Sequence, residues 1–174
     1  MIMSVAETKD LQRFIKGFPS EVQRLLYDLR AFIWERYPDA NELIYDNYNA
    51  LAIGWSPTDR VGHIFCNIAL GRSTTRIHFG FYWGSKLDDP KGILLGEGNQ
   101  YRYVIVENEK SYNNTYIRKL MKKAYAYSRS LVKDQKQIIE GQTITKSIST
   151  KKRPVGRKSV VKRQSTRVRG KRPG

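Results

Sequence analysis

The sequence predicts an α+β domain in which an antiparallel sheet of four or five strands is packed on one face by N-terminal helices and a C-terminal helix. Three observations favour this class. Apolar residues recur at helical intervals as far as Tyr37, and a period of two replaces that spacing from Leu51 onward. A helical period then returns after the last predicted strand. Short turns separate most of the predicted strands, as antiparallel hairpins require.

Two helices are predicted in the N-terminal part of the chain. Ser4 and Glu7 have the spacing of a capping box, which predicts a first helix near residues 5–17. Ser20 then caps a second, amphipathic helix that ends before Pro38. The apolar stripe of this second helix consists of Val22, Leu25, Leu26, Leu29, Ile33 and Tyr37.

The remaining elements follow in the order turn, strands and helix. Asp39 and Glu42 again have capping-box-like spacing, which predicts a third helical turn over residues 39–46. Strands are expected at about residues 51–55, 62–70, 74–82 and 101–107, with a long glycine-containing loop before the last one. Asn113 or Asn114 caps a final helix. Its inward-facing residues are predicted to be Ile117, Leu120, Met121, Ala124, Tyr127 and Leu131.

The charge of the chain is concentrated at its C-terminal end. The net charge of the 174 residues is +16, and residues 146–174 contribute 12 Lys/Arg without any acidic residue. That segment also lacks aromatic residues, so it cannot bury enough apolar area to offset the entropy of ordering it. We therefore expect a folded domain over residues 1–135 and a disordered basic tail over residues 136–174.

Composition also predicts where the protein resides. Cys66 is the only cysteine, which excludes an internal disulfide and suits a reducing compartment. No apolar run approaches the ~20 residues that span a bilayer. We expect a cytoplasmic protein that does not associate with membranes.

The basic tail predicts contact with DNA or RNA. Its lysines and arginines can each meet a phosphate, and without aromatic residues they cannot stack on bases, so binding should tolerate any sequence and weaken with salt. These residues are Lys151, Lys152, Arg153, Arg157, Lys158, Lys162, Arg163, Arg167, Arg169, Lys171 and Arg172. Arg118, Lys122, Arg129 and Lys133 share one face of the final helix and would extend the path. The alternative is a solubilising extension with no selected target.

The long loop and the ends of its flanking strands predict a ligand pocket. Gly96 and Gly98 leave backbone N–H groups free, and with the guanidinium of Arg102 they could receive a phosphate or carboxylate. The predicted walls and a candidate base are Trp55, Tyr82, Trp83 and His78. The alternative is that the glycines only permit tight turns and the aromatic residues pack in the core.

The two histidines and the cysteine do not predict zinc. If the hairpin pairs residue 66 with residue 78, Cys66 lies across from His78, and if it slips by one, His63 lies diagonal to His78. Either register supplies two ligands, whereas zinc sites use three or four. Cys66 is therefore expected to be a small buried hydrophobic residue. No catalytic motif is present, so no catalytic residue is predicted and enzymatic activity has no support.

The segment around the long loop resembles a known family. The run Phe81-Tyr82-Trp83-Gly84, then Leu87-Asp88-Asp89-Pro90-Lys91-Gly92, Gly96-Glu97-Gly98 and Arg102, is similar to the YdhG-like family, domain of unknown function 1801. The resemblance covers roughly residues 5–130. It implies a frataxin-like fold, a helix-covered antiparallel sheet, and a small-ligand or iron-binding function, because some relatives are described as iron chaperones. Asn99 departs from the lysine expected after the last glycine.

An iron-binding function would require exposed carboxylates, which are hard oxygen donors. Asp39, Glu42 and Asp46 are spaced i, i+3 and i+7, and would share a helical face if residues 39–46 were helical. They are the candidate metal residues. The alternative is a capping residue followed by a solvated helix face.

Overall fold

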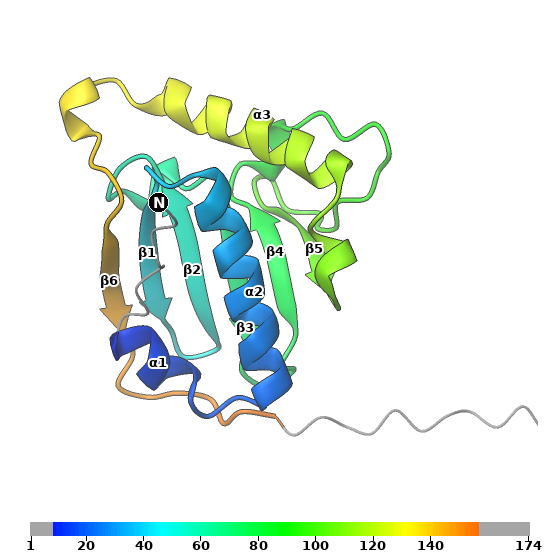
Figure 1. Ribbon diagram of the computed structural model, residues 1–174, viewed down its shortest axis with the longest axis vertical. Coiled ribbons are helices and arrows are strands. Elements are labelled where there is room, and N and C mark those ends of the chain that lie inside the picture. Colours follow the sequence, from blue (N-terminus) through cyan, green and yellow to red (C-terminus); the bar gives the residue numbers. More distant parts are fainter. Residues whose placement is uncertain (1–8, 157–174) are drawn as a thin grey trace, which may run out of the picture.

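Over residues 9–156, three helices and a six-stranded mixed sheet form the fold (Figure 1). The computed structural model describes residues 9–156. The helices are α1 (Lys9–Ile15), α2 (Ser20–Arg36) and α3 (Thr115–Leu131); the strands are β1 (Asn41–Asp46), β2 (Ala50–Ser56), β3 (Cys66–Gly71), β4 (Ile77–Phe81), β5 (Arg102–Val106) and β6 (Thr143–Ile148). The strand order is β5-β4-β3-β2-β1-β6. The α+β class is confirmed, whereas the prediction of a purely antiparallel sheet of four or five strands is wrong, because β6 pairs parallel to β1.

Alternate residues of the strands build the core against the helices. One row of paired residues crosses the sheet from Ile44 through Ile53, Ile68 and Phe79 to Val104, and all five are buried. In Figure 1, α2 lies in front of the sheet and α3 crosses its upper end. The intervening residues point to the other side of the sheet. We call that side the open face.

The two long helices follow the predicted pattern. Val22, Leu26, Leu29 and Ile33 are buried along α2, as expected from its apolar stripe. Ser20 is the first residue of α2 and makes no side-chain cap. At α3, Asn114 is the cap, and its side chain accepts a hydrogen bond from the backbone N–H of Ile117 at 2.9 Å.

The third helical turn predicted over residues 39–46 is wrong, because this segment contains strand β1. Glu42 and Asp46 are fully buried here, on the helix-facing side of the strand. Inward-pointing carboxylates hide the alternation of apolar and polar residues by which a strand is recognised. The capping-box spacing of Asp39 and Glu42 was therefore a coincidence of sequence.

The segment predicted to be a disordered tail contributes a strand to the fold. β6 lies at the edge of the sheet, and the chain after it continues along the lower end of the molecule (Figure 1). The N–H of Ser149 donates to Asp46, the N–H of Arg153 to Tyr48 and the N–H of Gly156 to Arg72, each to the backbone oxygen. We call residues 149–156 the strap. Residues 157–174, and residues 5–8 of the predicted first helix, lie outside the described residues.

Two strand boundaries differ from the prediction. The strand expected from residue 62 begins at Cys66, because Val61–His63 forms a 3-10 turn. The strand expected from residue 74 begins at Ile77, since Thr75 has a φ of 53° inside the preceding turn. Within residues 9–156, the helices are too short or too polar to cross a bilayer.

Candidate functional site

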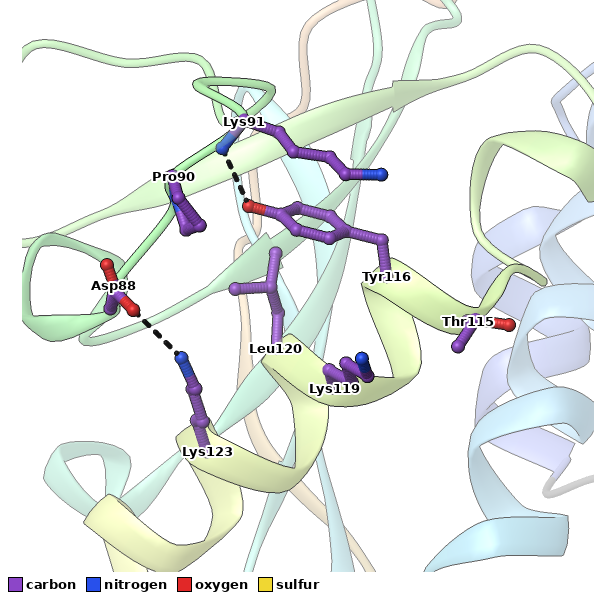
Figure 2. Close-up of a pocket in the computed structure, with 8 residues that line it drawn as sticks. All are labelled: Asp88, Pro90, Lys91, Thr115, Tyr116, Lys119, Leu120 and Lys123. Atoms are coloured by element: carbon purple, nitrogen blue, oxygen red, sulfur yellow. Dashed lines mark hydrogen bonds and ion pairs between the residues drawn. The ribbon is translucent and has the colours of Figure 1, made fainter.

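A cavity of about 330 Å³ lies between α3 and the loop that joins β4 to β5 (Figure 2). This volume is at the lower end of the range typical of ligand pockets. The cavity is lined by Asp88, Pro90 and Lys91 from the loop and by Thr115, Tyr116, Lys119, Leu120 and Lys123 from α3. The long loop therefore does border a cavity, but with side chains other than the predicted ones.

A tight turn fixes the loop wall of this cavity. The N–H of Gly92 donates to the backbone oxygen of Asp89 at 2.9 Å, which closes a turn with Pro90 in its second position. The Asp89 carboxylate accepts from the N–H of Leu94 at 2.9 Å and from the Tyr116 hydroxyl at 2.6 Å. Burial acts to raise the pKa of Asp89, but these hydrogen bonds outweigh it and lower the pKa. The turn is thus tied to α3 by an ionised carboxylate.

Three lysines give the cavity a positive potential. The Nζ of Lys91 lies 4.8 Å from the centre of the Tyr116 ring, a cation–π contact. Lys123 forms an ion pair with Asp88 at 3.2 Å between Nζ and Oδ2. Lys119 has no ion pair or hydrogen bond from its side chain within residues 9–156. With one carboxylate against three ammonium groups at its lining, the cavity favours an anion.

The positive charge continues along α3. Arg118, Lys119, Lys122 and Lys123 are exposed on successive turns, and the helix contains no acidic residue. The sequence predicted Arg118 and Lys122 as contacts but not Lys119 and Lys123, which line the cavity beside the loop. The dense run of four basic residues among six positions was the available signal.

The predicted ligand pocket is not assembled. Trp55 is fully buried on the helix side of the sheet, where it packs edge-on against Trp34. His78 lies on the open face, stacked on Tyr103 at 4.1 Å between ring centres. Trp83 donates from its ring N–H to the backbone oxygen of Gly62 at 2.8 Å. These side chains face different parts of the molecule.

Arg102 stabilises the loop by hydrogen bonds to the loop backbone. Its guanidinium donates to the backbone oxygens of Gly98 and Tyr101. Gly96 has a φ of 109°, so a glycine is required there by the turn. Neither glycine nor Arg102 lines the cavity of Figure 2. For Gly96 the structure favours the alternative interpretation, in which the glycine permits a tight turn, whereas Gly98 has no positive φ.

Both registers considered for the hairpin are wrong, because His78 pairs with Ala69. Cys66 lies opposite Trp55, on the neighbouring strand β2. The Nδ1 of His63 is 2.8 Å from the hydroxyl of Thr58. Among the described residues, no three His, Cys, Asp or Glu side chains are placed to hold a metal ion.

Cys66 is fully buried, as expected, and burial raises the pKa of its thiol well above the usual value. We predict that, in native protein, a thiol reagent will modify Cys66 only at the rate at which the surrounding structure unfolds locally or globally. In denaturant, the same reagent should modify Cys66 at once. The time course of labelling with and without denaturant measures this. Rapid labelling under native conditions would contradict the burial of the thiol.

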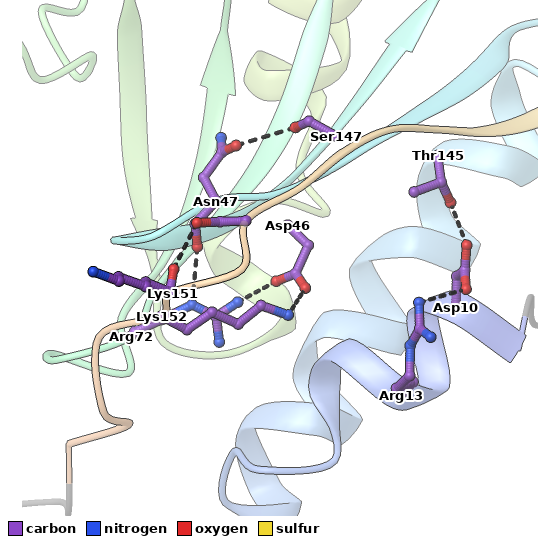
Figure 3. A network of polar contacts seen from close by, with 10 residues as sticks. Asp10, Arg13, Asp46, Asn47, Arg72, Thr145, Ser147, Lys151 and Lys152 are labelled. Carbon is purple, nitrogen blue, oxygen red and sulfur yellow. Dashed lines mark hydrogen bonds and ion pairs between the residues drawn. The ribbon is translucent and has the colours of Figure 1, made fainter.

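The predicted metal residues do not share a surface. Asp39 is exposed in the turn before β1, whereas Glu42 and Asp46 are fully buried. The Arg30 guanidinium donates to both Glu42 oxygens, at 2.6 and 2.9 Å. Asp46 accepts from Arg72 and from Lys152 (Figure 3). The two buried carboxylates have internal partners, which removes the exposed face on which the iron prediction was based.

Among the tail residues that the structure describes, Lys152 forms an ion pair inside the fold, where the sequence predicted a contact with phosphate. Its side chain is 33% exposed and its ammonium group is paired with Asp46, while Lys151 and Arg153 are exposed in the strap. The strap lies at the lower end of the sheet and α3 at the upper end (Figure 1), so the strap does not extend the α3 path. The other predicted contacts, Arg157, Lys158, Lys162, Arg163, Arg167, Arg169, Lys171 and Arg172, lie outside the described residues.

Comparisons with family models, with curated proteins and with solved structures found no match to this chain. The resemblance to the YdhG-like family and the iron-binding function that it implies therefore stay predictions.

Proposed function

We propose that the protein binds the phosphate backbone of a nucleic acid through the basic face of α3. The observation that carries this proposal is the exposure of Arg118, Lys119, Lys122 and Lys123 on a helix without acidic residues. Surface lysines are usually interspersed with carboxylates, which cancel their long-range field. Here α3 supplies no carboxylate of its own, and among the described residues only Lys123 of these four forms an ion pair, with Asp88 of the loop, so a positive field remains that attracts a polyanion.

The length of this basic face suits a strand of phosphates. Residues 118–123 span roughly 8 Å of helix axis at about 1.5 Å per residue. One strand of a duplex carries a phosphate about every 3.4 Å along its axis, so two or more phosphates face this span. The cavity beside it adds Lys91, from the opposite wall, to the same region.

If α3 binds the phosphate backbone, removing lysines from α3 should weaken the salt dependence of nucleic-acid binding. In full-length protein with Lys119→Gln and Lys122→Gln together, the slope of log K against log salt concentration should fall by about 2, because each lost phosphate contact removes about one unit. Binding of a fluorescent oligonucleotide, followed by anisotropy between about 50 and 200 mM salt, measures this slope. Wild type and variant share the same tail, so the difference reports on α3.

A matched control changes the same charge elsewhere. Lys16 follows α1 and Arg24 lies in the first half of α2, and both are exposed. Lys16→Gln with Arg24→Gln should leave the slope within experimental error of the wild type. Equal losses in the two double variants would show that binding follows net charge alone, and would reject α3 as the binding surface.

A further inference from the structure

A second cavity, of about 210 Å³, lies on the open face of the sheet, and we call it the groove. It is lined by Tyr45, Asn47, Ala52, Gly54, Val61, Ile64, Asn67 and Tyr82. None of these eight residues is charged. The groove is therefore chemically distinct from the lysine-lined cavity at α3.

Strand register explains the shape of the groove. Ala52 pairs with Tyr45 on one side and with Ala69 on the other, so the two central strands present only methyl groups in this row. In the next row, Gly54 pairs with Asn67, and the Ile64 side chain packs onto the Gly54 backbone. The result is a low floor at the alanine row near the centre of the sheet, bounded by the Ile64 side chain that covers Gly54.

Aromatic side chains stand beside this floor. Tyr45 projects from β1 and Tyr82 follows β4, on opposite sides of the two central strands. Val61, which is 48% exposed, belongs to the rim. Small residues between aromatic walls leave room for a flat ring lying on the sheet. A cavity of about 150 Å³ accommodates benzene, so the groove has space for a pyrimidine.

Two polar atoms of the groove residues lack partners. The hydroxyl of Tyr45 and the side-chain carbonyl of Asn67 are buried, and neither has a hydrogen bond within the described residues. Burial, with Tyr82 and Asp59 nearby, raises the pKa of Tyr45, so its hydroxyl stays protonated and can donate. Buried polar groups are normally satisfied. Both atoms belong to residues that line the groove, so a ligand that reaches them after a small side-chain movement, and that both accepts and donates a hydrogen bond, would satisfy this pair.

The groove lies close to α3. Trp83, the residue after Tyr82, packs edge-on against Tyr127 of α3 with 6.1 Å between ring centres. It also donates to the backbone of Gly62, beside Val61 at the rim. These two contacts place the rim of the groove beside the Tyr127 end of α3.

We propose that the groove binds an unpaired base, so that the partner of the protein is a single-stranded nucleic acid. This inference rests on the proposed binding of the backbone to α3. In a duplex, both ring faces and the pairing edge of each base are covered, whereas an unpaired base exposes them to aromatic side chains and to hydrogen-bonding groups. The flat floor, the tyrosine walls and the unpartnered donor and acceptor all fit such a base.

The test compares three probes on the full chain. They are an oligothymidylate of about 12 nucleotides, an abasic strand of the same length, and a duplex of the same length. The abasic strand keeps the phosphates and lacks the bases. Wild type should bind oligothymidylate about tenfold more tightly than the abasic strand at equal salt. Equal affinity for these two strands, or tighter binding of the duplex, would overturn the proposal.

Filling the groove should abolish this preference. Ala52→Leu places a larger side chain on the floor, and Tyr82→Ala removes a wall. In either variant, the affinity for oligothymidylate should fall about tenfold, to that for the abasic strand, while the affinity for the abasic strand is retained. Ala31→Leu, at an exposed position of α2, is the matched control and should keep the preference. Thermal melting of each variant establishes that it is folded. A preference that survives in folded Ala52→Leu and Tyr82→Ala would overturn the assignment to the groove.

The two proposals fail in different ways. If α3 does not bind the backbone, Lys119→Gln with Lys122→Gln leaves binding of the abasic strand unchanged. If the groove does not bind a base, that double variant weakens all three probes while Ala52→Leu has no effect. Free thymidine that competes at the concentration of the oligonucleotide would identify a nucleoside as the ligand and overturn the strand proposal.

Discussion

A chain that ends at residue 135 should unfold at a much lower denaturant concentration than a chain that ends at residue 156. The shorter chain lacks β6 and the strap, both of which the fold uses. β6 covers one edge of the sheet by pairing with β1, and the strap returns across the lower end. We expect the loss to be at least about 3 kcal/mol of a total stability near 5–15 kcal/mol.

The size of this effect comes from the buried carboxylates of β1. Thr143 of β6 donates from its hydroxyl to Glu42 at 2.9 Å, and Lys152 of the strap pairs with the fully buried Asp46. Without these partners, both carboxylates are left with part of their hydrogen-bonding capacity unsatisfied in a region shielded from water. Asp46 keeps Arg72 and Glu42 keeps Arg30, so each lost hydrogen bond to a charged group costs about 1.5–3 kcal/mol. The open edge of β1 adds a row of unpaired backbone groups.

Urea unfolding followed by circular dichroism, on chains ending at 135, 156 and 174, measures the effect. The chain ending at residue 156 should match full-length protein closely, because it keeps β6 and every described contact of the strap. If the chain ending at residue 135 were as stable as the one ending at 156, β6 and the strap would not belong to the folded domain. That result would support the boundary at residue 135 that composition suggests.

The elements that could be predicted are those whose residues alternate cleanly. In β3, Cys66, Ile68 and Leu70 face the helices while Asn67 and Ala69 face the other way, so the period of two is visible in the sequence. The apolar stripe of α2 is equally visible. In both cases one face of the element is apolar and the core selects that face.

β1 and β6 could not be recognised in this way because polar residues make their inward contacts. Glu42 points at Arg30, and Thr145 donates to the carboxylate of Asp10 in α1 at 2.8 Å. These partners are distant in sequence, so no local sequence pattern predicts the contacts. The β-branched residues at 143–145 were the only local sign of a strand.

The candidate site could be predicted only in part, again because its contacts join residues that are distant in sequence. The turn made by Asp89 and Pro90 can be read from the sequence, but its position depends on Tyr116, which lies 27 residues away. Lys91, Lys119 and Lys123 converge because this hydrogen bond and the Lys123–Asp88 ion pair hold the loop against α3. The groove depends on strand register, because a shift of one residue would turn the side chains of a strand to the other face of the sheet.

Replacement of Glu42 by alanine should destabilise the protein by about 3–5 kcal/mol. Arg30 is 2% exposed, and its guanidinium donates to both oxygens of Glu42, at 2.6 and 2.9 Å. Deleting the carboxylate removes the group that accepts two hydrogen bonds from this buried guanidinium and balances its charge. Arginine cannot lose its proton to relieve this cost, so the penalty persists at any practical pH.

The control is an ion pair on the surface. Glu35 pairs with Arg36 at 2.9 Å, but its side chain is 76% exposed. Glu35→Ala should cost less than about 1 kcal/mol, because water replaces the lost partner. Urea unfolding of both variants provides the comparison. Similar losses in the two would show that the Arg30–Glu42 pair is not shielded from water.

A double variant separates the two explanations for a large loss at Glu42. If the cost comes from an uncompensated buried charge, Arg30→Met combined with Glu42→Leu should be more stable than Glu42→Ala, because it removes both charges and fills the space with apolar atoms. If the pair instead supplies attraction that no apolar contact can replace, the double variant should be no more stable than the single one. We expect the first outcome. The pair would then specify how α2 docks on β1, rather than supply the stability of the sheet.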